Sequence, residues 1–282
     1  MKRISTIDAM KAACRQLTSS GRTLGFVPTM GALHEGHFSL VRASKARCHA
    51  TAVSIFVNPL QFAPTEDLDK YPRTLERDAT MLEKLGVELL FVPTVEEMYP
   101  EGAKTYVLVD ELSNKLDGAS RPGHFRGVTT VVTKLFEIVR PDYAFFGQKD
   151  AVQVAVLRKM AGDLDMDVQL IVCPIVREPD GLAMSSRNVY LSADQRRQAL
   201  VLHRALMRVQ MATDHGEQDP ARLAEIGRQV IGEEPGARLD YFAVVDPETL
   251  EPATTLARGA LVAVAAYFGS TRLIDNTVLA PR

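Results

Sequence analysis

Residues 25–41 read GFVPTMGALHEGHFSLV, and we expect the fold to be organised around this stretch. It overlaps a short apolar run, residues 24–27, which predicts a buried strand that stops at Pro28. A tight turn containing Gly31 follows, and apolar residues then recur at helical spacing. Free N–H groups at the start of a helix point outward, so this order of strand, turn and helix is typical of a phosphate-binding site in an α/β fold.

His34 and His37 are three residues apart, which puts both rings on one face of the first helical turn. The pair alone favours a simpler arrangement, in which one ring caps the helix or packs and the other is solvated. A metal site is a third possibility, but no third ligand is evident nearby and the His-Glu-x-x-His pattern is absent. The surrounding motifs have to decide between these alternatives.

The composition is that of a soluble globular protein. The chain has 282 residues, enough for two domains, with 46% hydrophobic and 24% charged residues. A formal net charge of −2 predicts no surface for nucleic acid or an anionic membrane, and no apolar run approaches the roughly 20 residues that cross a bilayer. Cys14, Cys48 and Cys173 are scattered without CxxC spacing, so we expect a reduced, cytoplasmic protein.

Apolar strands alternate with helices in the first part of the chain. Strands are predicted at residues 50–57, 87–92, 143–146 and 167–172, and helices at 7–17, 74–85, 128–139 and 152–160. This alternation predicts a Rossmann-like, doubly wound parallel sheet over residues 1–176. Near Arg177 the pattern changes to helices at 195–211 and 220–231, then strands at 239–245 and 260–268 joined by a turn at 246–249. We therefore expect a smaller α+β domain over residues 177–282.

Polar residues follow two of these strands, where ligands bind in doubly wound sheets. The tetrapeptide GQKD at 147–150 offers Lys149 to a phosphate and Asp150 to ribose hydroxyls, although a solvated turn would look the same. Gln153 lies on the same helical face as Asp150. Asn58 and Gln61 follow the strand at 50–57, where neutral amides can bind a substrate hydroxyl or carboxylate.

A second informative stretch is REPDGLAMSSRN at 177–188. Ser185, Ser186 and Arg187 supply several donors for phosphoryl oxygens, but a polar linker that caps a helix would have a similar composition. The basic loop RPGHFR at 121–126 is equally compatible with a solvated surface. A Gly-x-Gly-x-x-Gly loop is absent, which counts against a dinucleotide-dependent oxidoreductase.

Taken in order, seven motifs resemble one family closely. PTMGxLHxGH, IFVNPxQF, YPR, RPxHFxGV, FGxKD, DGLAxSSRN and VVDPETL follow one another along almost the whole chain. Together they resemble the pantothenate synthetase (pantoate–β-alanine ligase) family, within the HxGH nucleotidyltransferase superfamily. Two positions depart from the family pattern: Val152 stands where many relatives have a glutamine, and Met184 where leucine or alanine is more frequent.

The resemblance implies an ATP-dependent condensation of (R)-pantoate with β-alanine through a pantoyl-adenylate, with Mg²⁺ as cofactor and with release of AMP and pyrophosphate. It also implies a homodimer. The residues implied in ATP binding are Met30, Gly31, Ala32, Leu33, His34, Glu35, Gly36, His37, Gly147, Gln148, Lys149, Asp150, Val176, Met184, Ser185, Ser186 and Arg187. Those expected to act in catalysis are His34, His37, Lys149, Ser185, Ser186 and Arg187. Gln61 and Gln153 are implied in pantoate binding, Gln61 also beside β-alanine, with Asn58 added from its position; no side chain is assigned to a metal.

Three other functions are weighed against this one. Another nucleotidyltransferase of the superfamily would form a stable nucleotidyl product without an amine. A non-catalytic ATP-binding protein would need only the glycine turns, and would leave the two histidines, the Lys-Asp pair and the Ser-Ser-Arg triplet unexplained. A tRNA-aminoacylating enzyme would need a basic anticodon-binding region, which the net charge of −2 opposes.

Overall fold

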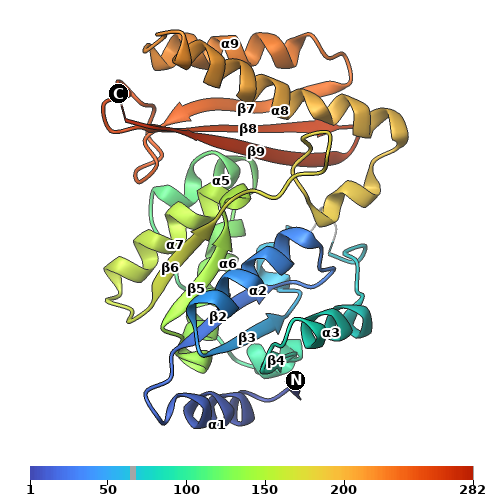
Figure 1. The fold of residues 1–282 in the computed structure, drawn as a ribbon, viewed down its shortest axis with the longest axis vertical. Helices are drawn as coiled ribbons and strands as arrows, with labels where there is room; N and C mark the ends of the chain where they lie inside the picture. The colour runs from blue at the N-terminus through green and yellow to red at the C-terminus, as the bar shows by residue number, and fades with distance from the viewer. Residues whose placement is uncertain (64–67, 282) are drawn as a thin grey trace.

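The computed structural model describes residues 1–63 and 68–281 and contains a six-stranded parallel sheet (Figure 1). The strand order is β1-β4-β3-β2-β5-β6. The strands are β1 (Lys2–Ile4), β2 (Leu24–Thr29), β3 (Ala50–Ile55), β4 (Leu89–Phe91), β5 (Tyr143–Gly147) and β6 (Gln169–Cys173). Every residue of β3 is buried, as expected of a central strand covered on both faces.

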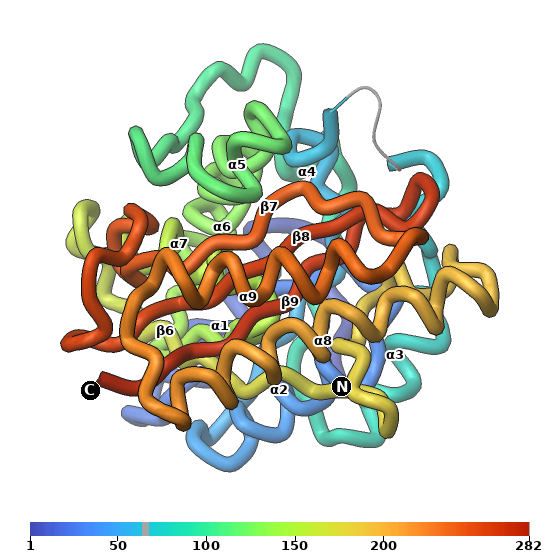
Figure 2. Tube along the Cα trace, turned by 90° about the horizontal axis from the view of Figure 1, so that it is seen from above, coloured from blue at the N-terminus to red at the C-terminus, as the bar shows by residue number. Residues whose placement is uncertain are grey.

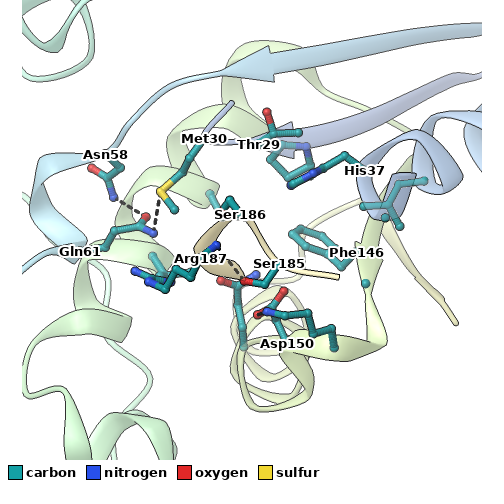
Figure 3. Close-up of a pocket in the computed structure, with 18 of the residues that line it drawn as sticks. Thr29, Met30, His37, Asn58, Gln61, Phe146, Asp150, Ser185, Ser186 and Arg187 are labelled. Atoms are coloured by element: carbon teal, nitrogen blue, oxygen red, sulfur yellow. Dashed lines mark hydrogen bonds and ion pairs between the residues drawn. The ribbon is translucent and has the colours of Figure 1, made fainter. Parts of the chain in front are cut away.

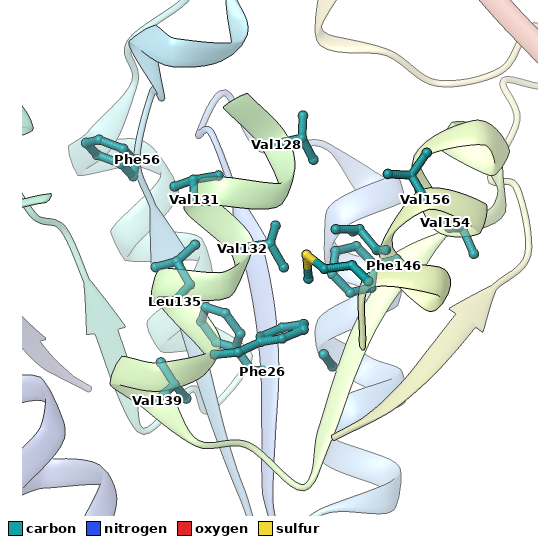
Figure 4. Packing of buried hydrophobic residues seen from close by; sticks show 14 of the residues in the cluster. Phe26, Phe56, Val128, Val131, Val132, Leu135, Val139, Phe146, Val154 and Val156 are labelled. Atoms are coloured by element: carbon teal, nitrogen blue, oxygen red, sulfur yellow. The ribbon is translucent and has the colours of Figure 1, made fainter. Parts of the chain in front are cut away.

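Helices cover both faces of this sheet, which confirms the predicted doubly wound architecture. α1 (Ile7–Thr18), α6 (His124–Val139) and α7 (Ala151–Asp163) contribute to one hydrophobic cluster, and α2 (Glu35–Arg47) and α3 (Leu75–Lys84) to a second. In the first cluster, Val128 and Val132 lie on the side of α6 that faces α7, and Val131 and Leu135 lie on its opposite side (Figure 4). Two short helices, α4 (Val95–Met98) and α5 (Asp117–Ser120), precede α6.

The first predicted strand extends further than expected. β2 continues through Pro28 to Thr29, so the prediction that Pro28 ends the strand was wrong. Proline has no N–H to donate, but β2 pairs with β5 only at Gly25 and Phe26, and its pairing with β3 continues to Thr29. The extension carries the strand directly to the turn before His34.

The C-terminal part has the predicted α+β composition. α8 (Ala193–Asp214) and α9 (Pro220–Gly232) pack on an antiparallel sheet of order β7-β8-β9, and Figure 2 shows both helices lying across it. α8 begins with a capping box in which the side chains of Ser192 and Gln195 accept from each other's backbone N–H groups. The other face of the sheet contributes Val245, Leu261 and Ala263 to the cluster beneath α6 and α7, so the hydrophobic contact is continuous between the two parts.

Two strands of the structure were not predicted. β1 has only three residues, and β9 (Thr271–Leu279) has its apolar pattern interrupted by Asp275 and Asn276. The connection between β7 (Ala237–Val245) and β8 (Ala260–Phe268) is also longer than the predicted four-residue turn. Among the described helices, none has the length and apolar character needed to cross a membrane.

Candidate active site

A cavity opens where β2, β3 and β5 end, and most of the predicted site residues line it. In the view of Figure 3, His37 and Phe146 lie on one side of it, Asn58 and Gln61 on the other, with Ser186 between them. The predicted residues that line it are Met30, His34, Gly36, His37, Asn58, Gln61, Gly147, Lys149, Asp150, Gln153, Val176, Met184, Ser185, Ser186 and Arg187.

Five other predicted residues are not among those that line the cavity. These residues are Gly31, Ala32, Leu33, Glu35 and Gln148. Leu33 is 2% exposed within the hydrophobic cluster under α2, and Glu35 forms an ion pair with Arg42 on the surface. Gln148 Nε2 donates to Asn276 Oδ1 at 3.0 Å. The ATP contacts assigned to these five residues therefore require their backbone groups, and the assignments stay predictions.

Asp78 holds the turn between β2 and α2, and sequence reasoning missed it. It is 1% exposed on α3, and its Oδ1 accepts from the backbone N–H of Leu33 at 3.1 Å and from the Thr74 hydroxyl at 3.1 Å. Gly31 and Ala32 in this turn have φ values of 86° and 52°, the left-handed region that glycine adopts most easily. A helical aspartate ordinarily predicts a solvated face, so nothing in the sequence identified this role.

The two histidines are arranged so that each presents Nε2–H. His34 is the N-cap of α2, and its Nδ1 accepts from the Gly36 N–H at 3.2 Å. His37 Nδ1 in turn accepts from the His34 N–H at 3.4 Å, which completes a capping box. A neutral imidazole whose Nδ1 accepts a hydrogen bond carries its proton on Nε2. Both rings, with centroids 4.2 Å apart, are therefore hydrogen-bond donors through Nε2.

Both rings are neutral at physiological pH. Burial lowers the pKa of His34 to about 4, with a further contribution from the Lys149 charge, and Asp150 opposes the shift. Burial likewise lowers the pKa of His37 to about 3, helped by the neighbouring His34 and opposed by Asp150. The pair thus presents fixed dipoles, not cations, at the N-terminus of a helix.

The pKa values predict that neither ring titrates between pH 8 and about pH 5. The Nε2 protons of His34 and His37 should stay in place over this interval, as followed by imidazole nitrogen NMR, with His37→Gln used to assign the signals. The unfolded chain takes up these protons below about pH 6.5 and the folded protein does not, so their contribution to stability decreases as the pH falls through this range. A titration midpoint near 6.5 in either ring would contradict the assignment.

Lys149 and Asp150 form a charged pair at the start of α7. Lys149 Nζ lies 3.3 Å from Asp150 Oδ1. Burial raises the pKa of Asp150, but Lys149, His37 and Arg187 outweigh it, so the pKa is held below its usual value and the carboxylate is ionised. A fixed cation and a fixed anion consequently lie next to the two neutral rings.

Ser185, Ser186 and Arg187 line the same cavity from the segment that follows β6. Ser185 Oγ accepts from the Arg187 N–H at 3.2 Å and caps the short helix η4 (Ser186–Tyr190). Ser186 Oγ lies 3.3 Å from the Tyr71 hydroxyl, which belongs to the YPR motif. These contacts place two hydroxyls and a guanidinium among the donors around the cavity.

Asn58 orients Gln61. Asn58 is 1% exposed, and its Nδ2 donates to Gln61 Oε1 and to the Gly127 carbonyl, both at 3.0 Å. Its Oδ1 accepts from the Tyr99 hydroxyl at 2.9 Å. Both N–H groups of Asn58 therefore donate within the protein, and one of them fixes the amide of Gln61. Gln61 turns its Nε2 toward the cavity, where one contact is Met30 Sδ at 3.2 Å.

Gly127 permits the backbone next to Gln61 to lie against α6. A Cβ added at Gly127 would meet the Leu60 carbonyl oxygen at 2.3 Å and the Gln61 nitrogen at 2.6 Å. Gly127→Ala is therefore expected to lower the free energy of unfolding by about 1–3 kcal/mol and to displace Gln61. Chemical denaturation measures the first effect, and the KM of the substrate predicted to bind Gln61 measures the second. Gly162→Ala on α7, where an added Cβ meets nothing within 4 Å, is the control, and equal behaviour of the two variants would contradict the argument.

Arg121 and His124 line the cavity, although the sequence left their loop undecided. His124 Nδ1 lies 2.8 Å from the Gln61 carbonyl oxygen, and Arg121 Nη1 lies 2.9 Å from His124 Nε2. Arg121 and His124 are therefore part of the cavity wall, whereas Pro122, Gly123 and Arg126 of the same loop are exposed. The RPxHFxGV motif was the available signal, but its residue types alone did not say which way they point.

Comparison with known proteins agrees with this geometry. The sequence model described as Pantoate-beta-alanine ligase matches residues 2–278. The chain belongs to this ligase family. It is 63% identical to the pantothenate synthetase of Koribacter versatilis over 279 residues, covering 99% of this chain and 96% of that protein. It is 55% identical to the pantothenate synthetase of Pelotomaculum thermopropionicum, covering 98% of each chain.

Solved structures of pantoate–β-alanine ligases have the same fold. The crystal structure of pantothenate synthetase from Thermus thermophilus superposes with a TM-score of 0.95 at 46% identity, covering all of both chains. A ligase from Francisella tularensis, described as a complex with β,γ-ATP and β-alanine, superposes with a TM-score of 0.80 at 34% identity, covering 99% of this chain and 97% of that one. The chain is thus a ligase of pantothenate biosynthesis, and its cavity is the candidate active site of that ligase.

Proposed function

We propose that this ligase condenses (R)-pantoate with β-alanine at the expense of ATP, through a pantoyl-adenylate, and releases pyrophosphate and AMP. The observation that carries the proposal is the convergence of phosphate donors and amides on one cavity: the neutral Nε2–H groups of His34 and His37, Lys149 and the Ser-Ser-Arg triplet, with Gln61 at the other side. The Francisella relative, described as a complex with an ATP compound and β-alanine, supports the same substrates.

In the first step, a carboxylate oxygen of pantoate attacks the α-phosphorus of ATP, and the bond to pyrophosphate breaks. Negative charge spreads over the phosphoryl oxygens and the leaving group. The Nε2–H donors of the two histidines, with Lys149, Ser185, Ser186 and Arg187, are assigned to these oxygens. They are fixed in place before reaction, so little reorganisation is needed as the charge develops. Gln61 and Gln153 are assigned to pantoate, and Val176 to the adenine.

In the second step, the amine of β-alanine attacks the acyl carbon of the adenylate. An amide bond forms, the bond to the phosphate oxygen breaks, and AMP leaves while the amine loses a proton. No covalent attachment to the protein is needed, and the thiols of Cys14, Cys48 and Cys173 are buried. Burial also raises the pKa of the Cys14 thiol to about 12, which leaves that thiol un-ionised. Holding both reactants in one cavity supplies most of the acceleration expected of this step.

Mg²⁺ fits this site as a companion of ATP. The described part of the chain has no cluster of three side chains able to ligate a metal. Mg²⁺ is usually held by one or two carboxylates together with substrate phosphates and water, and Asp150 is an ionised carboxylate that lines the cavity. Asp150 would therefore hold it, and the ion when bound would neutralise phosphate charge.

The remaining assignments are proposals of the same kind. A cytoplasmic protein agrees with three free cysteines that are all buried, and a homodimer with the family resemblance. A boundary between the nucleotide-binding part and the C-terminal part near residue 177 agrees with the change from a parallel to an antiparallel sheet.

The test is pyrophosphate release from ATP and Mg²⁺ with pantoate alone, followed by addition of β-alanine. A single turnover with pantoate, becoming continuous with β-alanine and matched by AMP and pantothenate, is expected. Continuous release without amine, with a stable nucleotidyl product, would instead identify a nucleotidyltransferase. ATP binding without turnover under either condition would identify a non-catalytic nucleotide-binding protein.

A further inference from the structure

The two segments that carry the proposed phosphate donors are short and irregular. Lys149 lies on the single-turn helix η3 (Gln148–Asp150), which has no side-chain cap, and Ser185 precedes η4 after a loop. Such segments have few internal hydrogen bonds, so their positions depend on contacts from other parts of the chain. Both are contacted by β9, an edge strand of the C-terminal sheet.

Asn276 of β9 is bonded to the segment that carries Lys149. Its Nδ2 donates to the backbone carbonyls of Gln148 and Lys149, both at 2.9 Å, and its Oδ1 accepts from Gln148 Nε2 at 3.0 Å. Asn276 is 3% exposed. These three bonds use both of its N–H groups, and an amide is the side chain that can donate to two carbonyls and accept a third bond together.

Asp275, the preceding residue, is bonded to the segment that leads to Ser185. Its carboxylate accepts from Arg177 Nη1 at 2.6 Å and from Nη2 at 3.0 Å, a bidentate pair in which Asp275 is 3% exposed. Arg177 Nη1 also donates to the Gly181 carbonyl at 3.0 Å. The segment then turns back on itself, because Arg177 and Ala183 form a β-bridge two residues before Ser185.

The alternation of a strand explains how adjacent residues reach two separate segments. Successive side chains of a strand point to opposite faces of the sheet. Asn276 pairs with Ala263, which packs in the cluster beneath α6 and α7, whereas Asp275 pairs with Val264, which packs under α8 and α9. One dipeptide therefore contacts the Lys149 segment on one face and the Arg177 segment on the other.

We propose that Asp275 and Asn276 are positioning residues of this ligase, Asn276 fixing the backbone that carries Lys149 and Asp275 fixing, through Arg177, the loop that carries Ser185, Ser186 and Arg187. The inference rests on the proposed function, since it concerns the same phosphate donors. It gives the C-terminal sheet a role in adenylation that does not require it to touch a substrate.

Asn276→Asp tests the inference with little change of shape. The carboxylate cannot donate to the two carbonyls, so the segment carrying Lys149 is expected to shift, and pantoate-dependent pyrophosphate release should fall by on the order of 10²-fold. ATP affinity should fall as well. In a Lys149→Ala background, Asn276→Asp should lower pyrophosphate release and ATP affinity by no more than about a further twofold each. The Lys149 side chain, which Asn276 is proposed to position, is already absent there. Asn276→Ser, which retains one donor, should lie between the wild type and Asn276→Asp.

Thr213→Val is the matched control for a loss of stability alone. Thr213 is buried on α8, and its hydroxyl donates to the Val209 carbonyl at 2.9 Å, remote from the cavity. At an equal drop in Tm, this variant should retain wild-type rates. Wild-type rates in folded Asn276→Asp, or an equal loss with and without Lys149, would overturn the positioning role. Failure of the wild type itself to turn over would reject the proposed function. ATP affinity in the wild type, Asn276→Asp, Lys149→Ala and the double variant would still decide the inference.

Discussion

Lys149→Met is expected to slow pantoate-dependent pyrophosphate release by roughly 10²–10³-fold, because it removes a fixed cation from the part of the cavity proposed to hold the phosphates. The methionine retains most of the aliphatic stem, so the packing at the start of α7 should survive. The Lys149 side chain is only 21% exposed, and a partly desolvated charge acts on a neighbouring anion more strongly than one in open water. Single-turnover measurement of pyrophosphate separates this loss from any change in product release.

The control for this variant lies on the same helix. Lys159 is exposed on α7 and forms an ion pair with Asp163, so Lys159→Met removes an equal charge outside the cavity. Its adenylation rate should equal that of the wild type. Lys149→Arg should recover part of the loss, since it restores charge with a different geometry. Equal rates for Lys149→Met and Lys159→Met would exclude a catalytic role for Lys149.

Asp150 provides a second readout of the same change. Lys149 is the main reason that the pKa of this half-buried carboxyl stays low, so its removal allows the desolvation of Asp150 to raise that pKa. In Lys149→Met, the residual activity should therefore decrease on the acid side at a higher pH than in the wild type. The direction follows from the charge alone and does not depend on how ATP is oriented.

The sequence was sufficient for the parts of the fold that depend on local pattern. The fully buried strand at β3 and the helical spacing in α6 are properties of adjacent residues, and both were predicted correctly. β9 was missed because Asp275 and Asn276 interrupt its apolar alternation, and their burial is explained by partners about a hundred residues away or more. Such polar pairs look like a loop until the partners are known.

The same distinction applies to the site. His34, His37 and Lys149 stand beside predicted strand ends, so their convergence on one cavity followed from the rule that ligands bind at the carboxyl edge of a parallel sheet. Asp78 and His124 could not be found in this way. Each acts through a contact to a backbone group distant in sequence, Leu33 N–H for one and the Gln61 carbonyl for the other.

His37→Ala is expected to reduce adenylation by roughly 10²-fold or more, by the loss of one preorganised donor to the phosphoryl oxygens. The structure refines the test, because it assigns the donated proton to Nε2 and gives Nδ1 to the His34 N–H. Glutamine can place an amide N–H near the position of Nε2, whereas asparagine reaches only the position of Nδ1. His37→Gln should therefore retain more activity than His37→Asn, and the two should differ little in Tm.

The comparison of these two amides distinguishes donation from simple helix capping. If His37 served mainly to cap α2, the activities of the two variants would follow their Tm values, because glutamine at N3 also completes a capping box. Single-turnover pyrophosphate release measures the rates, and thermal unfolding measures the cap. Because the pKa of His37 is about 3, the ratio of wild-type to His37→Gln activity should be the same at pH 6 and pH 8; a wild-type advantage confined to low pH would mean that a protonated imidazolium is the active form. Near-normal release by a folded His37→Ala enzyme would remove this histidine from the mechanism.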